Sequence, residues 1–252
     1  MAGSGFAAIE PRQASGDVVK AMIAVLPAER RQGTGAALYR AVSAWAREQG
    51  RRTLETFVLE SDPDGLDYAT KRGFVEVGRE QMVALDLAGV EEPRLEPPVG
   101  VVIVTLAERP EVTPGIYEVA CEAYPDIPAS EDGEMEPYEG WLAHDLRGAG
   151  DRPEATFVAL AGDEVVGYAK FHLSDARPAV AVHDITAVRR AWRRRGIARA
   201  LKSAEIAWAM HHGYERLETA NELRNAPIRR LNERFGYRPM PGRALLRGPL
   251  AP

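Results

Sequence analysis

Apolar and polar positions form their clearest pattern after residue 99. Runs of β-branched and apolar residues predict strands over 101–106, 155–160, 165–173, 179–188, 217–220 and 243–250. Apolar residues at helical spacing and helix-start signals predict helices over 113–124, 141–146, from 197 to about 212, and over 227–234. Elements in this order predict an α/β (α+β) fold, with a mixed central sheet and helices on both faces.

Part of this pattern occurs earlier in the chain as well, at an offset of 163 residues that takes Gly33 to Gly196 and Gly73 to Gly236. A repeat that keeps its register in this way indicates a duplicated structural unit. Residues 91–98 contain three prolines and three glutamates, which suits a stiff, solvated linker. We therefore expect a partial, degenerate unit over 1–90, a linker over 91–98 and a complete unit over 99–252.

The first copy starts late in the pattern, because two strands and two helices of the second copy have no counterpart in it. Either the start codon is placed late or the first unit is a half-domain. The strand predicted over 6–10 would then be a sheet edge with unpaired backbone groups. We expect this region to be covered by protein, either by the second unit or by another copy of the chain, and a symmetric homodimer is the favoured solution.

Charge and composition exclude several classes of function. The formal net charge of -5 gives no general attraction to nucleic acid or to an anionic membrane, although residues 189–195 form a local basic run around Trp192. Cys121 is the single cysteine, so no internal disulfide is possible. No signal peptide and no apolar run of roughly 20 residues is visible. We expect a cytoplasmic protein without nucleic-acid partners, membrane insertion or a metal site.

The repeated segments 30–35 and 193–198 are the candidate ligand-binding segments. Each follows a strand that ends in valine, contains arginines and a glycine, and opens an amphipathic helix. The start of a helix offers unpaired N–H groups and the positive end of the helix dipole, and glycine lets a bulky anion approach the backbone. Both segments therefore predict a phosphate-binding loop.

With Asn225 about thirty residues farther on and then Phe235-Gly236-Tyr237, the chain resembles the GNAT superfamily of acyl-CoA-dependent N-acyltransferases. The resemblance is to its tandem two-domain form, of which mycothiol synthase is one example. It implies acetyl-CoA as donor, a primary amine of a small molecule as acceptor, and direct attack in a ternary complex. It also implies a cofactor site formed by Ala187, Val188, Arg193, Arg194, Arg195, Gly196, Ile197, Ala198, Asn225 and Asn232.

Within that site, the resemblance implies that the backbone of 194–198 binds the CoA pyrophosphate and that Asn225 contacts the pantetheine arm. Ala187 and Val188 would hold the pantetheine and polarise the acetyl carbonyl. Asn232 stands where many of these enzymes have a tyrosine that protonates the leaving thiolate. A degenerate second site is implied at Val25, Arg30, Arg31, Gly33, Thr34 and Gly35.

In the first unit, Asp62 and Ala69 occupy the asparagine and tyrosine positions of the family. The asparagine that would contact the pantetheine arm is thus replaced by a carboxylate in the first unit.

An acceptor amine is protonated at neutral pH, so the reaction needs a base. Asp184 and His183, on the strand before the loop, are the two candidates, with bound water as a third route, and Ala21 matches Asp184 in the first unit. An acidic segment could attract a cationic acceptor, or it could be an ordinary solvated loop; its residues are Glu131, Asp132, Glu134, Glu136 and Glu139. The alternative to an enzyme is a non-catalytic CoA-binding or interaction protein.

Overall fold

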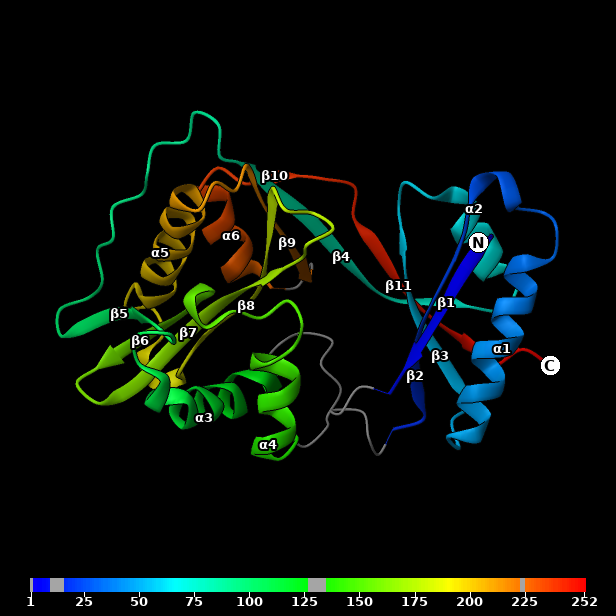
Figure 1. The fold of residues 1–252 in the computed structure, drawn as a ribbon, viewed down its shortest axis with the longest axis horizontal. Helices are drawn as coiled ribbons and strands as arrows, with labels where there is room; N and C mark the ends of the chain where they lie inside the picture. The colour runs from blue at the N-terminus through cyan, green and yellow to red at the C-terminus, as the bar shows by residue number, and fades with distance from the viewer. Residues whose placement is uncertain (1, 10–15, 127–134, 223–224) are drawn as a thin grey trace. The chain divides into compact units, whose positions relative to one another are not determined.

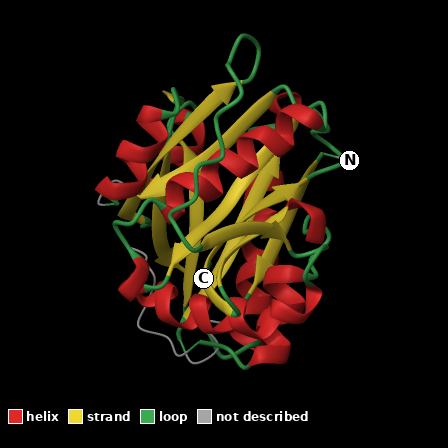
Figure 2. Cartoon of the chain, turned by 90° about the vertical axis from the view of Figure 1, so that its left-hand side faces the viewer, coloured by secondary structure: helices red, strands yellow, loops and turns green. Residues whose placement is uncertain are grey.

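A computed structural model describes residues 2–9, 16–126, 135–222 and 225–252 (Figures 1 and 2). Two compact units account for the fold. The first unit consists of Met1–Gln81 with Pro241–Pro252, and the second of Met82–Met240. Within the described ranges, no helix combines the length and apolar character that spanning a bilayer requires.

The sheet of the first unit has the strand order β1-β2-β3-β11-β4. Its members are β1 (Gly3–Ala8), β2 (Val18–Val25), β3 (Thr53–Leu59), β11 (Arg243–Pro249) and the first part of β4 (Val75–Asp86). The β2–β3 pair is parallel and the other pairs are antiparallel, so the sheet is mixed. Helices α1 (Thr34–Glu48) and α2 (Pro63–Thr70) contribute Tyr39, Val42 and Ala69 to its single hydrophobic core.

The second unit has the strand order β4-β9-β8-β7-β6-β5, and β10 (Arg238–Pro239) pairs with residues 83–84 of β4. Its other strands are β5 (Val101–Thr105), β6 (Thr156–Ala161), β7 (Glu164–Leu173), β8 (Val180–Val188) and β9 (Arg216–Glu222). The pairs β5–β6, β6–β7 and β7–β8 are antiparallel, and the pair β8–β9 is parallel. This confirms the predicted mixed sheet.

Helices cover both faces of this second sheet (Figure 1). On one face, α5 (Ile197–His211) packs through Ile197, Leu201 and Ile206. On the other face lie α3 (Thr113–Ala123), the 3-10 turn η4 (Tyr124–Asp126), α4 (Tyr138–Trp141) and the turn η5 (Leu142–Leu146). Helix α6 (Ala226–Arg234) follows β9. The helices on the second face are those for which the described part of the first unit has no counterpart.

The units differ from the expected division by chain order. Residues 82–86 belong to the second unit, and 241–252, expected in the second unit, belong to the first, where β11 lies between β3 and β4. Residues 91–98 contain no helix or strand. They lie along α5, because Glu92 contacts His211 and Glu96 lies 3.8 Å from Arg199.

Strand pairing also changes which residues of the two copies correspond to each other. Gly3 pairs with Val25 and Gly167 with Val188, so Phe6 takes the place of Lys170. The β7–β8 register shifts after Lys170, which pairs with Ile185, while Phe171 pairs with His183. Asp184 is therefore an extra, bulged residue, and β2 has no such shift. The expected match of Asp184 with Ala21 is thus wrong, since the constant offset ends at the bulge.

Candidate functional site

The loop between β8 and α5 has the backbone form that an anion-binding helix start requires. Arg194 and Gly196 have left-handed φ values of 63° and 92°. Gly196 precedes the first helical residue, and no side chain caps the helix. A Cβ atom at Gly196 would meet nothing within 4 Å, so the first N–H groups of α5 are approachable. Ile197 is buried in the core and Ala198 packs against it, so these two residues have mainly their backbone to offer a ligand.

The loop between β2 and α1 repeats this backbone. Arg31 and Gly33 have φ values of 65° and 87°, and a Cβ at Gly33 would also meet open space. Thr34 then begins α1. In both loops the first arginine is tied to the preceding strand: Arg30 Nε donates to Val25 O at 3.3 Å, and Arg193 Nε donates to Val188 O at 3.0 Å. Each of these arginines thus has a structural role as well as a charge.

The charges around the two loops differ. In the second unit, Arg193 and Arg190 lie 2.7 and 2.9 Å from Asp126, and their hydrogen bonds lower the pKa of that carboxyl to about 2. The guanidinium of Arg195 lies 4.8 Å from the ring centre of Trp192. Asp126 ends a helical segment that has no counterpart in the described part of the first unit.

In the first unit the acids come from the start of α2. Arg30 lies 3.8 Å from Asp62 and 3.3 Å from Asp64, and Arg31 lies 3.7 Å from Asp64. Asp62 also caps α2 by accepting a hydrogen bond from Gly65 N at 3.1 Å. Close to Gly35, the Tyr68 ring lies 3.3 Å from where a Cβ would be. Two carboxylates therefore lie beside this loop, which has the backbone form of a phosphate-binding loop.

Next to each loop, two parallel strands separate. Pairing of β8 with β9 is confined to residues 180–182 and 216–218, and that of β2 with β3 to 18–20 and 53–55. Beyond these points β8 continues to Val188 and β2 to Val25. Backbone groups on that edge of β8 are therefore not taken up by strand β9. Arg189 N donates to Val166 O of β7 at 3.0 Å, so the alternation along the strand turns the Ala187 backbone toward β7 and the Val188 backbone toward the open edge.

The bulge places the two candidate bases on opposite faces of the sheet. Ala187 and Ile185 pack with α3 and α4, whereas Ala181 packs with α5. Asp184 lies on the α3 side, with 45% of its side chain exposed, and its Oδ2 is 2.7 Å from Lys170 Nζ. Sequence reasoning missed Lys170, whose only signal was a lysine inside an apolar strand.

His183 is buried on the α5 face. Its Nε2 hydrogen-bonds with the hydroxyl of Tyr237, and its Nδ1 lies 3.1 Å from Oε1 of the buried Glu205. Burial lowers the pKa of His183, against the opposing effect of Glu205. The neutral imidazole is thus a member of a buried polar cluster that also includes Lys202.

The two asparagines lie at α6. Asn225 is the N-cap residue of this helix, and its side chain makes no capping hydrogen bond. Asn232 is buried, and its Nδ2 donates to Asn221 Oδ1 at 3.4 Å. Its Oδ1 has no partner among the described residues. Asn232 thus faces the interior beside β9, where an amide can accept or donate a hydrogen bond but cannot act as an acid.

The acidic segment is described only in part, because Glu131, Asp132 and Glu134 lie outside the described residues. Glu136 is buried, and its Oε2 lies 3.0 Å from Nδ1 of His144. Tyr117 donates to the backbone oxygen of Glu136 at 2.8 Å. In the described ranges, no group of three or more His, Cys, Asp or Glu side chains has a metal-binding arrangement.

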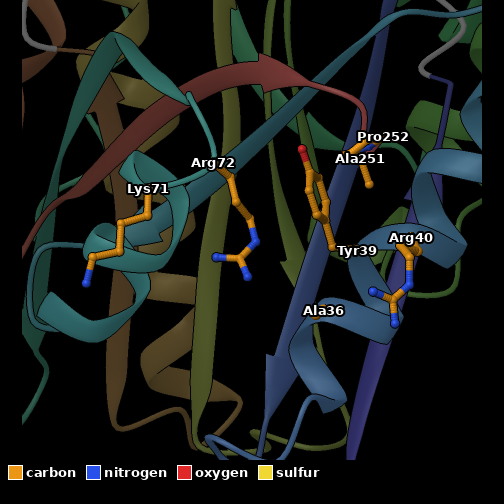
Figure 3. A pocket seen from close by; sticks show the side chains of 7 residues that line it. All are labelled: Ala36, Tyr39, Arg40, Lys71, Arg72, Ala251 and Pro252. Carbon is orange, nitrogen blue, oxygen red and sulfur yellow. The ribbon is translucent and has the colours of Figure 1, made fainter.

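A cavity of about 440 Å³ lies in the first unit, between α1 and the end of α2 (Figure 3). Tyr39 and Arg40 line it from α1, Lys71 and Arg72 from the turn that follows α2, and Ala251 from the C-terminal segment. The Arg72 guanidinium lies 5.8 Å from the Tyr39 ring centre. Sequence reasoning missed this site, whose three cations suit an anionic ligand.

Comparison with known proteins agrees with this geometry. The sequence matches the Acetyltransferase (GNAT) family over residues 4–74 and 113–237, which is more than half of the chain. No curated protein matches it.

Among solved structures, a GCN5-related N-acetyltransferase from Sphaerobacter thermophilus is 23% identical with a TM-score of 0.72, and the match covers 100% of this chain and 78% of that one. A tandem GNAT protein from the clavulanic acid biosynthesis pathway is 21% identical with a TM-score of 0.74, covering 94% and 76%. A GCN5-related N-acetyltransferase from Kribbella flavida is 18% identical with a TM-score of 0.62, covering 99% and 88%. These likenesses show the fold. The chain belongs to the GNAT acetyltransferase family and has its tandem form.

Proposed function

We propose that the protein is an acetyl-CoA-dependent N-acetyltransferase whose second unit is catalytic and whose first unit is degenerate. One observation carries this proposal. The second unit combines a phosphate-type loop, separated strands and a bulge that presents Asp184, whereas the first unit has the loop and the separated strands without the bulge. A carboxylate beside the cofactor route is what the acceptor amine needs.

The described residues fit the donor that the family generally uses. The backbone N–H groups of Arg194 to Ala198 would receive the pyrophosphate, because the approach to Gly196 is open. Asn225 and the separated strands β8 and β9 would hold the pantetheine arm, with Asn232 behind them. The backbone N–H of Val188, on the open edge of β8, would stabilise negative charge on the acetyl oxygen. Acetyl-CoA supplies the acyl group and a thiol leaving group.

Asp184 accepts the proton of the acceptor ammonium in this proposal. The amine nitrogen then bonds to the acetyl carbon and the carbon–sulfur bond breaks. The nitrogen gives up its second proton to the departing thiolate, either directly or through water, so CoA leaves as the thiol. His183 has less support as the base, because it is buried on the other face of the sheet. A thiolate is a good leaving group, so Asn232 in place of a tyrosine is compatible with turnover.

A small cationic amine is the acceptor class that the charges favour. Asp184 is on the α3 side, and Asp145 of η5 lies near Tyr168 on that same side, where both carboxylates raise the pKa of Tyr168 after the larger effect of burial. Carboxylates gathered on one side attract cations. The acceptor side of the sheet is therefore the α3 face.

Calorimetry with acetyl-CoA tests which unit binds the donor. Gly196→Glu puts a bulky anion where the pyrophosphate would lie and should abolish binding. Gly33→Glu is the matched control, because it makes the same change at a glycine of nearly the same φ. It should leave the high-affinity site intact. Loss of binding in Gly33→Glu alone would contradict the assignment.

A non-catalytic CoA-binding protein is the second candidate. It is favoured by Asn232, which replaces the usual acid, and by the first-unit loop, where Asp62 and Asp64 stand beside the arginines. Acetyl-CoA turnover against a panel of amines separates the two functions. Binding without turnover for every amine would favour this candidate.

We also infer that the chain forms a homodimer. Strand β1 is at the end of its sheet, and its Phe6 pairs with Met22 of β2. Both side chains are 58% exposed. An open strand edge with exposed apolar side chains favours pairing with another chain.

A further inference from the structure

Three charged side chains meet beside the bulge in β8. Lys170 Nζ lies 2.6 Å from Asp151 Oδ1 and 2.7 Å from Asp184 Oδ2. The Lys170 and Asp151 side chains are only 3% and 4% exposed, whereas Asp184 is 45% exposed. The cluster therefore has a buried ion pair and one carboxylate that reaches solvent.

Hydrogen bonds to both of its oxygens hold the Asp151 carboxylate in place. Its Oδ2 accepts a hydrogen bond from Gly148 N at 2.9 Å while its Oδ1 binds Lys170. Both oxygens of this buried carboxylate are thus occupied, and it holds the ammonium group in one place. A buried charge with fixed partners has little freedom to rearrange.

Lys170 stays charged in this setting. Burial lowers its pKa, but Asp184 and Asp151 together more than offset that effect, and the net pKa is raised. One ammonium between two carboxylates leaves one net negative charge, and Asp184 is the member that meets solvent.

The surroundings of Asp184 hold few other titratable groups. On the same face, Tyr168 of β7 interacts with Asp184, with Tyr124 of η4 and with Asp145 of η5. Thr156 of β6, which pairs with Lys170, is neutral. His183 is adjacent in sequence but lies on the other face. Lys170 is thus the one cation in contact with Asp184 among the described residues.

The first unit supplies an internal comparison. Phe6 occupies the position of Lys170, and β2 has no bulge. The buried lysine and the bulge therefore occur together in the unit that we propose to be catalytic, and neither occurs in the other unit. A lysine kept only to stabilise the sheet would not need to accompany the bulge.

We propose that Lys170, held by Asp151, is a positioning residue that fixes the Asp184 carboxylate at the bulge as the anion that receives the acceptor ammonium. This inference rests on the proposed function for the identity of the acceptor, but not for the arrangement itself. Lys170 holds Oδ2 of Asp184, so the exposed remainder of the carboxylate faces the acceptor side.

The test is the position of the Asp184 side chain in a crystal structure of Lys170→Met, together with amine acetylation by that variant. Without the ammonium group, the Asp184 carboxylate should leave the position that it has beside residue 170. The KM for the amine should rise several-fold, while the acetyl-CoA affinity measured by calorimetry stays unchanged. Lys170→Arg keeps a cation and should restore both the carboxylate position and most of the KM.

A second variant controls for misfolding. Lys170→Met combined with Asp151→Asn removes the buried ion pair as a whole and leaves no unpaired buried charge, and it should still displace the Asp184 carboxylate. An unchanged Asp184 position and an unchanged KM for the amine in both variants would overturn the proposal. A displaced carboxylate in a protein without turnover would support the positioning role and contradict the proposed function instead.

Discussion

Two neighbouring residues, His183 and Asp184, show how one bulge separates buried from reactive chemistry. His183 lies in the core, hydrogen-bonded to Tyr237, while Asp184 reaches solvent and pairs with Lys170. The bulge adds one residue to β8, so His183 and Asp184 can point to opposite faces of the sheet. The residues before and after them keep their regular alternation between the two faces. His183, whose intrinsic pKa suits a general base better, is thus the residue with less access to a substrate.

At Asp184, we predict that Asp184→Asn lowers the rate on the acidic limb and leaves the affinity for acetyl-CoA nearly unchanged. The amide keeps the shape of the side chain but cannot accept a proton. The pH–rate profile together with calorimetry measures both quantities. A profile identical to that of the unmodified protein would eliminate Asp184 as the base.

At His183, we predict that stability falls as the pH drops below about 6.5. Burial lowers the pKa of the folded-state imidazole, so the unfolded chain takes up a proton first. The free energy of unfolding then decreases by up to about 1.4 kcal/mol per pH unit until the folded-state pKa is reached.

Thermal unfolding between about pH 7.5 and 5.5 measures this contribution, with His183→Gln as the comparison because glutamine does not titrate. The variant should lose part of the pH dependence. Equal pH dependence in both proteins would show that His183 contributes nothing to it.

Among the elements, the two loops share one backbone but not one electrostatic setting. Arg31 and Arg194 have the same left-handed conformation, and so do Gly33 and Gly196. Asp62 and Asp64 of α2 then pair with the arginines of the first loop, while Asp126 does so in the second. Loop geometry alone therefore does not distinguish the units, and the bulge in β8 does.

We predict that deletion of Asp184 is tolerated by the fold and abolishes acetyl transfer. Without it, residues 181, 183, 186 and 188 would alternate regularly toward α5, as the strand β2 does without a bulge toward α1. The stability loss should be about 1–2 kcal/mol, or roughly 2–8 °C in Tm. Calorimetric unfolding and a turnover assay measure the two effects, and a fully active deletion variant would contradict the role of the bulge.

Much of the element pattern could be predicted from sequence, but the bulge could not. Residues 197–211 have a helical apolar period, and the glycines at 196 and 213 mark the ends of that helix, so local signals suffice. In β8, His183 and Asp184 are consecutive polar residues, and either could be assigned to the core face. Lys170 looked like an ordinary strand lysine, because its partners Asp151 and Asp184 are brought to it only by folding.

For the whole molecule, the units are not two consecutive segments. Strand β11, at the C-terminus, lies between β3 and β4 of the first unit, and residues 82–86 belong to the second. The proline-rich segment 91–98 suggested a simple boundary, and such non-local pairing leaves no trace in local composition. By contrast, the repeat itself already indicated that the helices on the α3 face of the second unit have no counterpart in the described part of the first.

In solution, we predict a dimer by light scattering, because β1 leaves an edge with exposed Phe6 and Met22. Phe6→Lys combined with Met22→Lys should shift the population toward the monomer, since charges on an edge oppose pairing. A monomeric unmodified protein would contradict this prediction.

The central claim is that the second unit transfers acetyl groups to an amine. The most direct measurement is amine-dependent release of CoA from acetyl-CoA, with the product identified by mass spectrometry, for the unmodified protein, Gly196→Glu and Gly33→Glu. We predict an N-acetylated amine in the unmodified protein and in Gly33→Glu, and none in Gly196→Glu. Turnover that survives Gly196→Glu and disappears in Gly33→Glu, or an absence of turnover in the unmodified protein with every amine, would contradict the claim.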